Sequence, residues 1–287
     1  MKRLLITGGS GFLGSRLTQL ALATPSPAAY PDWEVYPTYF THPITHPNAV
    51  RIDLKNRKAV EALVGNLKPA AIIHQAISSG SQDEIAAIVP AARHMADAAI
   101  DHHVRLVHVS TDMVFDGENA PYTEQSPIAP LSPYGAAKAF AEGLITSMMP
   151  EAIIVRPSLI YGFDPVDKQM GWIIEGMRRG ETVRLFTDEF RCPIWVDTVA
   201  LALLELAGGR REGILNLGGP QSLNRWDYGT KMLKYLGIEL SPNLIKSTVV
   251  ESGLKRPRDL TMDVSRARRL LRTPLLTVDE AFESHRR

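Results

Sequence analysis

The chain has 287 residues, 45% of them hydrophobic and 22% charged, and its 32 Lys and Arg nearly balance its 31 Asp and Glu. That length can bury a sizeable core, in one large domain or in a large and a small one. The formal net charge of +1 leaves no basic surface for nucleic acid or an anionic membrane. No apolar run approaches the ~18 residues that span a bilayer, so we expect a cytoplasmic protein with neither nucleic-acid nor membrane partners.

The cysteine and histidine content bears on metal binding. Cys192 is the only cysteine, which excludes an internal disulfide and a thiolate cluster for zinc. The eight histidines show no His-Glu-x-x-His or comparable spacing, and His102-His103 is typical of a helix end. We therefore expect no metal site.

A short apolar strand, predicted over residues 2–7, runs directly into a glycine-rich segment. Gly8, Gly11 and Gly14 form the pattern G-x-x-G-x-x-G, and a helix is predicted over 15–23. Glycines allow a tight turn and close approach of the backbone to a pyrophosphate, and the positive end of the helix dipole attracts that charge. Because the glycines lie between a strand and a helix, they predict a nucleotide site rather than a flexible loop.

Apolar runs then alternate with helical patterns through the first half of the chain. The predicted strands cover 34–40, 70–75, 106–110 and 152–156, and the predicted helices cover 56–66, 84–102 and 134–149. Strands separated by helices predict an α/β fold, a Rossmann-type doubly wound parallel sheet with right-handed crossovers. The proline-rich residues 24–27 are typical of a surface loop.

The alternation becomes less regular after residue 157. Residues 162–167 are loop-like and a helix is predicted near 168–179. We expect a dinucleotide-binding domain over 1–160, to which 194–217 return. The predicted smaller C-terminal lobe, which binds substrate, comprises 161–193 and 218–287.

Tyr134 and Lys138 are about one helical turn apart, so both side chains lie on one face of the predicted helix. A phenol has a pKa of about 10, and a neighbouring ammonium favours the phenolate and brings proton exchange closer to neutral pH. A surface pair of this kind usually has no role. Here Thr111 also follows a predicted strand and adds a hydroxyl at the end of the sheet. The three residues predict a general acid, a cation and a polar clamp.

These motifs resemble the extended short-chain dehydrogenase/reductases, most closely the dTDP-4-dehydrorhamnose reductase group. The resemblance covers nearly the whole chain. Its further motifs are Ile52-Asp53-Leu54, His74-Gln75-Ala76, Ser110 to Gly117, Arg156 to Gly162, Arg191 to Asp197, Leu215 to Gly219 and Arg256 to Asp259. It implies an NAD(P)-dependent oxidoreductase that acts on a nucleotide sugar.

The resemblance also implies roles for single residues. Tyr134 would exchange the proton at a sugar carbonyl oxygen, Lys138 would bind the nicotinamide ribose and lower the pKa of the phenol, and Thr111 would hydrogen-bond the same oxygen. Asp53 would contact the adenine, or alternatively cap the helix that follows. The predicted cofactor-binding residues are Gly8, Gly11, Phe12, Leu13, Gly14, Arg16, His42, Asp53, Leu54, Gln75, Ala76, Tyr134 and Lys138.

The end of the second strand bears on the choice of cofactor. NAD-specific folds place Asp or Glu there to bind the ribose 2′-hydroxyl, whereas this strand ends in Tyr39-Phe40-Thr41-His42. Arg16 or a protonated His42 could pair with a 2′-phosphate instead, although Arg16 could equally be a solvated helix residue. We expect NADP, with NAD as the alternative.

The predicted substrate-binding residues are Thr111, Asp112, Met113, Tyr134, Arg191 and Arg258. Arg191 and Arg258 could bind the diphosphate of a nucleotide sugar, because guanidinium matches phosphate oxygens in a fork, or each could be a surface ion-pair residue. Asp112 could also be a loop residue.

Two positions depart from the family pattern. Met113 stands where the reductases typically have tyrosine and where dehydratases have the glutamate that eliminates water, which argues against dehydratase activity. Arg16 stands where some relatives have the glutamate of a metal-linked dimer, so we expect no magnesium site.

Three functions fit these observations. The first is an NADPH-dependent reductase of a nucleotide-activated 4-keto-6-deoxy sugar, with hydride transfer to the keto carbon and Tyr134 as general acid. The second is a nucleotide-sugar epimerase with tightly held NAD(P). The third is a non-catalytic, NADP-binding regulatory subunit like that of methionine adenosyltransferase, against which the intact Thr111, Tyr134 and Lys138 weigh. A homodimer is common in relatives, and the sequence leaves the oligomeric state of this chain open.

Overall fold

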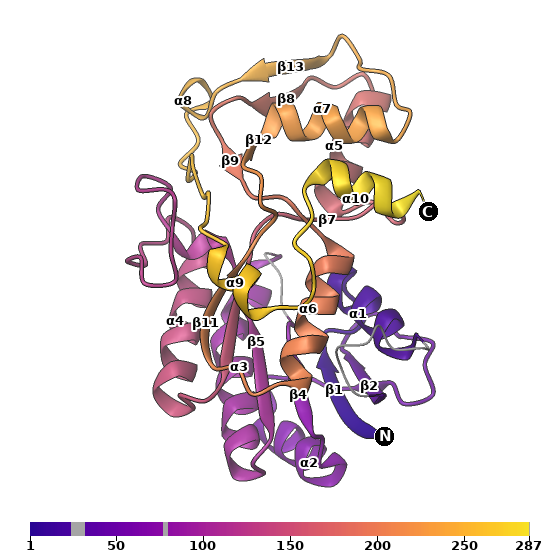
Figure 1. The fold of residues 1–287 in the computed structure, drawn as a ribbon, viewed down its shortest axis with the longest axis vertical. Coiled ribbons are helices and arrows are strands. Elements are labelled where there is room, and N and C mark those ends of the chain that lie inside the picture. The colour runs from indigo at the N-terminus through magenta and orange to yellow at the C-terminus, as the bar shows by residue number, and fades with distance from the viewer. Residues whose placement is uncertain (24–31, 77–79, 287) are drawn as a thin grey trace.

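The computed structural model describes residues 1–23, 32–76 and 80–286, and its centre is a seven-stranded sheet (Figure 1). The strands are β1 (Lys2–Thr7), β2 (Trp33–Tyr39), β3 (Val50–Arg51), β4 (Ala71–His74), β5 (Arg105–Val109), β6 (Ile153–Pro157) and β11 (Gly213–Leu217). Their order is β11-β6-β5-β4-β1-β2-β3, and all neighbours are parallel. The predicted Rossmann-type sheet is confirmed. Residues 24–27, expected as a loop, lie outside the described residues.

Helices cover both faces of this sheet. They are α1 (Phe12–Leu22) and α6 (Val196–Gly208) on one face, and α2 (Arg57–Leu67), α3 (Gln82–Asp101) and α4 (Pro133–Met148) on the other. Successive strand residues point to opposite faces. Accordingly Leu4 and Ile6 of β1 pack with α1 and α6, whereas Leu5 packs with the other three helices. Strands buried on both faces explain the continuous apolar runs in the sequence.

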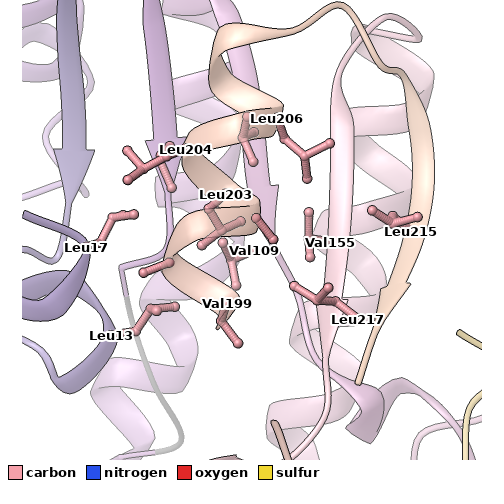
Figure 2. Close-up of a cluster of buried hydrophobic side chains, with 14 of the residues drawn as sticks. Leu13, Leu17, Val109, Val155, Val199, Leu203, Leu204, Leu206, Leu215 and Leu217 are labelled. Atoms are coloured by element: carbon pink, nitrogen blue, oxygen red, sulfur yellow. The ribbon is translucent and has the colours of Figure 1, made fainter. Parts of the chain in front are cut away.

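Figure 2 shows the core on the α1 and α6 face. Leu203 of α6 lies between Leu13 of α1 and the sheet residue Val155, and Leu204 lies on the side of α6 toward Leu17. All five are buried. This packing fixes α1, and with it the glycine-rich turn, against the sheet.

Past β6 the chain builds a smaller group of elements beyond the carboxyl ends of the sheet strands (Figure 1). They are β7 (Ile160–Tyr161), α5 (Lys168–Arg178), β8 (Val183–Phe186), β9 (Phe190–Arg191), β10 (Ile194–Trp195), β12 (Leu223–Asn224), α7 (Arg225–Tyr235), β13 (Leu244–Ser247) and α8 (Val249–Ser252). The strands pair as β10-β7, β12-β9 and β13-β8. These elements have a hydrophobic core of their own that includes Tyr161, Met170, Ile173 and Tyr228.

The remaining elements are the 3-10 helix η1 (Asp112–Val114) after β5, and the helices α9 (Ser265–Leu270) and α10 (Val278–His285). The first helix begins at Phe12, three residues before its predicted start, because Gly11 is its N-cap. Among the described residues, no helix has the length and hydropathy that crossing a membrane requires.

Candidate functional site

A cavity of about 1020 Å³ lies at the carboxyl ends of β1, β2, β4, β5 and β6. Ligands of open α/β sheets bind at this edge. The predicted residues that line the cavity are Gly8, Gly11, Phe12, Leu13, His42, Asp53, Leu54, Gln75, Ala76, Thr111, Asp112, Met113, Tyr134, Lys138 and Arg191. Gly14, Arg16 and Arg258 are not among its lining residues.

The glycine-rich turn is built by close backbone contacts. Gly8 has a φ of +70°, a conformation that favours glycine, and a Cβ on Gly14 would lie 2.2 Å from the Gly8 carbonyl oxygen. The Gln75 amide nitrogen donates to the carbonyl oxygens of Thr7 and Gly8, at 2.6 Å each. The missing side chain at Gly14 therefore lets α1 pack closely against the turn. The first N–H groups of α1 have no partners within the helix, so this turn fits the pyrophosphate of a dinucleotide.

The end of β2 forms a second part of the cavity wall. Thr41 Oγ1 and His42 Nδ1 are 2.9 Å apart, and both residues line the cavity. Asp53 also lines it, and its carboxylate accepts a hydrogen bond from the Lys55 backbone at 2.9 Å. The N-cap of α2 is Asn56, not Asp53.

Arg16 is not among the residues that line the cavity. Its guanidinium forms two hydrogen bonds with the carboxylate of Asp197 in the first turn of α6, and hydrogen bonding to that carboxylate raises the pKa of Arg16. The side chain therefore links α1 to α6. Of the two predicted contacts for a 2′-phosphate, only His42 lines the cavity.

Arg258 does not line the cavity, although the Phe190 N–H next to Arg191 donates to its carbonyl oxygen at 2.6 Å. Its Nη2 donates to Glu118 at 3.0 Å, and about half of its side chain, 49%, is exposed. Arg258 is therefore a surface ion-pair residue, which is the second of the two roles that the sequence allows for it.

Local sequence positions Tyr134 relative to Thr111. The Ser132 hydroxyl accepts a hydrogen bond from the Gly135 N–H at 3.0 Å, and Pro133 occupies the first turn of α4. A Cβ on Gly135 would lie 2.2 Å from the Met113 carbonyl oxygen. The missing side chain at Gly135 therefore lets η1 pack directly against the start of α4.

Burial controls the protonation of the two residues on α4. It raises the pKa of Tyr134 to about 12, with the Thr111 hydroxyl opposing the shift and the charge of Asp112 adding to it. Burial lowers the pKa of Lys138 to about 8, and Glu142 opposes that shift. The expected lowering of the phenol pKa by Lys138 is therefore not what the structure shows. Near neutral pH the phenol keeps its proton and the ammonium is mostly charged.

Lys138 is close to the phenol but does not bond it. Its Nζ donates to the Val109 carbonyl oxygen at 3.0 Å and lies 6.0 Å from the centre of the Tyr134 ring. An ammonium has two further N–H donors, and Lys138 lines the cavity. The residue can thus hold hydroxyl groups of a ligand there.

Asp112 is buried, not part of a solvated loop. Its carboxylate accepts from the Ser158 hydroxyl at 3.0 Å and lies 3.7 Å from Nε of Arg191. Burial raises the pKa of Asp112, and Arg191 opposes the shift. Arg191 Nη2 also lies 3.8 Å from the sulfur of Met113.

The polar lining residues that the sequence did not predict include Ser158, Lys168 and Arg225. Ser158 lies within the Arg156 to Gly162 motif. Lys168 and Arg225 each begin a helix, where a charged side chain usually indicates a solvated surface. No signal in the sequence separated them from other charged residues.

Within the part of the chain that the structure describes, no group of three His, Cys, Asp or Glu side chains is arranged to hold a metal ion. The absence of a metal site remains a prediction.

Curated relatives align over most of the chain. A probable low-salt glycan biosynthesis reductase, Agl14 of Haloferax volcanii, is 27% identical over 275 residues, which is 91% of this chain and 89% of that protein. A dTDP-4-dehydrorhamnose reductase of Aggregatibacter actinomycetemcomitans is 29% identical over 215 residues, 72% of this chain and 68% of that protein. Methionine adenosyltransferase 2 subunit beta of Xenopus laevis is 32% identical over 168 residues, 56% of this chain and 48% of that protein.

Solved structures share the fold. The dTDP-4-dehydrorhamnose reductase of Bacillus anthracis, solved in complex with NADP, superposes with a TM-score of 0.82 at 22% identity, covering 99% of this chain and 98% of that one. The family model described as RmlD substrate binding domain matches residues 1–285. The chain therefore belongs to the RmlD substrate-binding domain family and has the extended short-chain dehydrogenase/reductase fold that its motifs resemble.

Proposed function

We propose that the chain is an NADPH-dependent reductase of a nucleotide-activated keto-deoxy sugar, acting as a dTDP-4-dehydrorhamnose reductase does. The observation that supports this proposal most directly is one cavity lined by the glycine-rich turn and by Thr111, Tyr134 and Lys138. The family match and the reductases among the relatives support the same class of reaction.

The residues that line the cavity would hold a nicotinamide dinucleotide at several points. The turn at Gly8 and Gly11 would receive the pyrophosphate, His42 the 2′-phosphate, and Lys138 the hydroxyls of the nicotinamide ribose. The bound nicotinamide would supply hydride to the keto carbon of the sugar. NADP is our preferred cofactor, with NAD as the alternative.

Tyr134 would donate the proton that the carbonyl oxygen needs. A pKa of about 12 keeps this phenol protonated throughout the physiological range, which is the state a reduction requires at its start. Thr111 would donate a second hydrogen bond to the same oxygen and stabilise the negative charge that develops there.

The match to the methionine adenosyltransferase subunit keeps a regulatory role as the second candidate. Matches to this subunit cover from 56% to 96% of the chain, so coverage does not argue against the role. The site residues Thr111, Tyr134 and Lys138 are all present and line one cavity. These residues favour catalysis.

The test is oxidation of NADPH and of NADH, followed by cofactor absorbance, with dTDP-4-dehydrorhamnose and its isomers. Tyr134→Phe should reduce turnover by ~10²–10⁴-fold, because it removes the proton donor, and should leave NADPH binding within about twofold. Tight NADPH binding with no turnover of any keto sugar would favour a regulatory subunit. Inversion of a sugar centre without net NADPH consumption would favour an epimerase.

A further inference from the structure

A buried ion pair lies one helical turn beyond Lys138 on α4. Glu142 is four positions from Lys138, so the two side chains share one face of the helix. Nε of Arg156 donates to Glu142 Oε1 at 3.0 Å and to Oε2 at 3.1 Å, and its Nη2 donates to Oε2 at 2.6 Å. The side chains of Arg156 and Glu142 are 1% and 2% exposed. The Arg156 guanidinium also lies 5.1 Å from the centre of the Phe115 ring. Both oxygens of the carboxylate are therefore held in place close to Lys138.

The sheet strands under α4 present two imidazoles to Lys138. His74 of β4 and His108 of β5 are in register and buried, on the face that α2, α3 and α4 cover. Burial, with the charge of Lys138 adding to it, lowers the pKa of His74 to about 3 and that of His108 well below its usual value. Both imidazoles are therefore neutral near neutral pH and supply no compensating charge.

The remaining carboxylates near α4 lie elsewhere around the cavity. Asp112 of η1 belongs to the buried network with Ser158, and Asp83 and Glu84 in the first turn of α3 are exposed. Burial lowers the pKa of Lys138, and Glu142 is the charged group that opposes this effect. The carboxylate of Glu142 is thus the charge that compensates the ammonium.

Lys138 and Arg156 are two buried cations beside the one carboxylate of Glu142. A buried charge is costly without a partner. The two cations respond differently to the loss of that partner, because a guanidinium keeps its proton in proteins, whereas a buried ammonium readily gives its proton up. Removal of the negative charge should therefore appear at Lys138, as a neutral amine.

We propose that Glu142, held in place by Arg156, is the positioning residue that keeps the Lys138 ammonium charged. The pair thereby sets the highest pH at which Lys138 makes charge-assisted hydrogen bonds to the cofactor. This second step rests on the proposed function and deepens it. Neither Glu142 nor Arg156 lines the cavity, so both act through Lys138 and not on a ligand.

A purely structural pair and a positioning pair predict different effects on Lys138. If the pair only fastens α4 to the sheet, its loss destabilises the fold and leaves the pKa of Lys138 unchanged. If Glu142 compensates Lys138, removal of the carboxylate lowers the pKa of the ammonium. Removal of the Arg156 guanidinium raises it, because Lys138 is then the nearest cation to the carboxylate.

The experiment follows the ε-carbon resonance of Lys138 by NMR in the full chain without ligand, over about pH 6 to 11. The resonance is assigned by its loss in Lys138→Arg. We expect Glu142→Gln to lower the pKa of Lys138 by about one pH unit or more, and Arg156→Gln to raise it by about half a pH unit. The pH at which NADPH affinity begins to decrease should move in the same direction in each variant.

The matched control is Asp97→Asn on α3, which covers the same face of the sheet. This substitution removes a carboxylate whose side chain is 22% exposed and 3.9 Å from Arg93. It should shift the pKa of Lys138 by less than about 0.2 pH unit, because solvent screens the charge of Asp97.

Two results would overturn the positioning role. One is a Lys138 pKa in Glu142→Gln that is less than about 0.3 pH unit below the wild-type value, and the other is a lowered pKa in Arg156→Gln. If Glu142→Gln fails to fold, the double variant Glu142→Gln/Arg156→Gln removes both charges together. The pKa of Lys138 should still lie below the wild-type value there, because the carboxylate that raises it is gone. An unchanged value in the double variant would contradict the role of Glu142.

The titration of Lys138 needs neither cofactor nor substrate, so the two proposals fail separately. A protein whose Lys138 responds to both substitutions as expected but reduces no keto sugar keeps the positioning role and loses the reductase. A reductase whose Lys138 titrates alike in every variant keeps the activity and loses the positioning role.

Discussion

One physical cause acts on Tyr134 and Lys138 in opposite directions. Burial favours the neutral form of each group, so it raises the pKa of the phenol to about 12 and lowers that of the ammonium to about 8. The phenol of Tyr134 therefore stays protonated at neutral pH, and Lys138 loses its proton just above neutral pH. The pH dependence of activity at this site should therefore follow the protonation of Lys138.

The activity should decrease as the pH rises through about 8, because Lys138 is charged below its folded-state pKa and neutral above it. We expect kcat/KM and NADPH affinity to decrease together in this range, by up to about tenfold per pH unit for kcat/KM. The measurement is a pH profile from about 6 to 10. Lys138→Arg, whose guanidinium stays charged, should lose the alkaline decline. A wild-type profile flat to pH 10 would contradict this role.

Arg16 and His42 should differ in their effect on cofactor preference. Arg16 is bonded to Asp197, so Arg16→Ala should change the ratio of NADPH to NADH affinity by less than about twofold. His42 lines the cavity, and His42→Ala should lower that ratio by about threefold or more. Fluorescence titration of each variant with both cofactors measures the ratio. A large loss of NADPH preference in Arg16→Ala alone would restore the 2′-phosphate role that the sequence suggested.

Helices α1 and α4 reach the cavity only because glycines let the backbone approach closely. Gly14 admits α1 to the turn at Gly8, and Gly135 admits η1 to the start of α4. A buried ion pair between Glu142 of α4 and Arg156 of β6, with Nη2 and Oε2 2.6 Å apart, further fixes α4 on the sheet. The positions of α1, η1 and α4 therefore depend on close contacts that leave no room for a larger side chain at Gly14 or Gly135.

Gly14→Ala should weaken NADPH binding by more than about tenfold, because the new methyl group would lie 2.2 Å from the Gly8 carbonyl oxygen and displace the turn. The matched control is Gly143→Ala on α4, where a Cβ meets nothing within 4 Å. That control should stabilise the protein by about 0.5–1 kcal/mol through helix propensity and leave binding unchanged. Equal NADPH affinity in the two variants would show that the turn is not the pyrophosphate site.

At the scale of the whole molecule, the cavity joins the sheet edge to the smaller group of elements beyond it. Residues at or directly after the carboxyl ends of β1, β2, β4 and β5 line it together with Arg191 and Arg225, which follow β6 in the chain. The boundaries of the two predicted lobes and the homodimer stay predictions. The edge strand β11, in the segment expected to return to the first domain, pairs with β6.

Cofactor binding should therefore stabilise the folded chain as a whole. NADPH at about 100 times its Kd should add about 2.7 kcal/mol to the free energy of unfolding and raise Tm by several degrees. NADH at the same concentration should raise Tm less. Differential scanning fluorimetry with each cofactor measures this, and Gly14→Ala should show a smaller shift. An equal Tm shift by both cofactors would favour NAD use over our preference for NADP.

Local patterns in the sequence determined the fold class and much of the candidate site. The strand, glycine turn and helix at the amino terminus are consecutive, and Tyr134 and Lys138 are one turn apart, so short-range geometry alone brought these groups together. The alternation of apolar runs and helices likewise predicted a parallel sheet, whose carboxyl edge is where the cavity lies.

Only the tertiary structure decided which charged residues face a ligand and which face each other. Arg16 meets Asp197 from 181 positions away, and Arg225 meets Glu189 beside the cavity. It also decided the protonation of Tyr134, because burial raises the pKa of the phenol and outweighs the opposing hydrogen bond with Thr111. The physical reason is the same in each case. Desolvation and ion pairing depend on which surfaces the fold brings together, and the sequence does not distinguish a charged residue that will be buried and paired from one that will face a ligand.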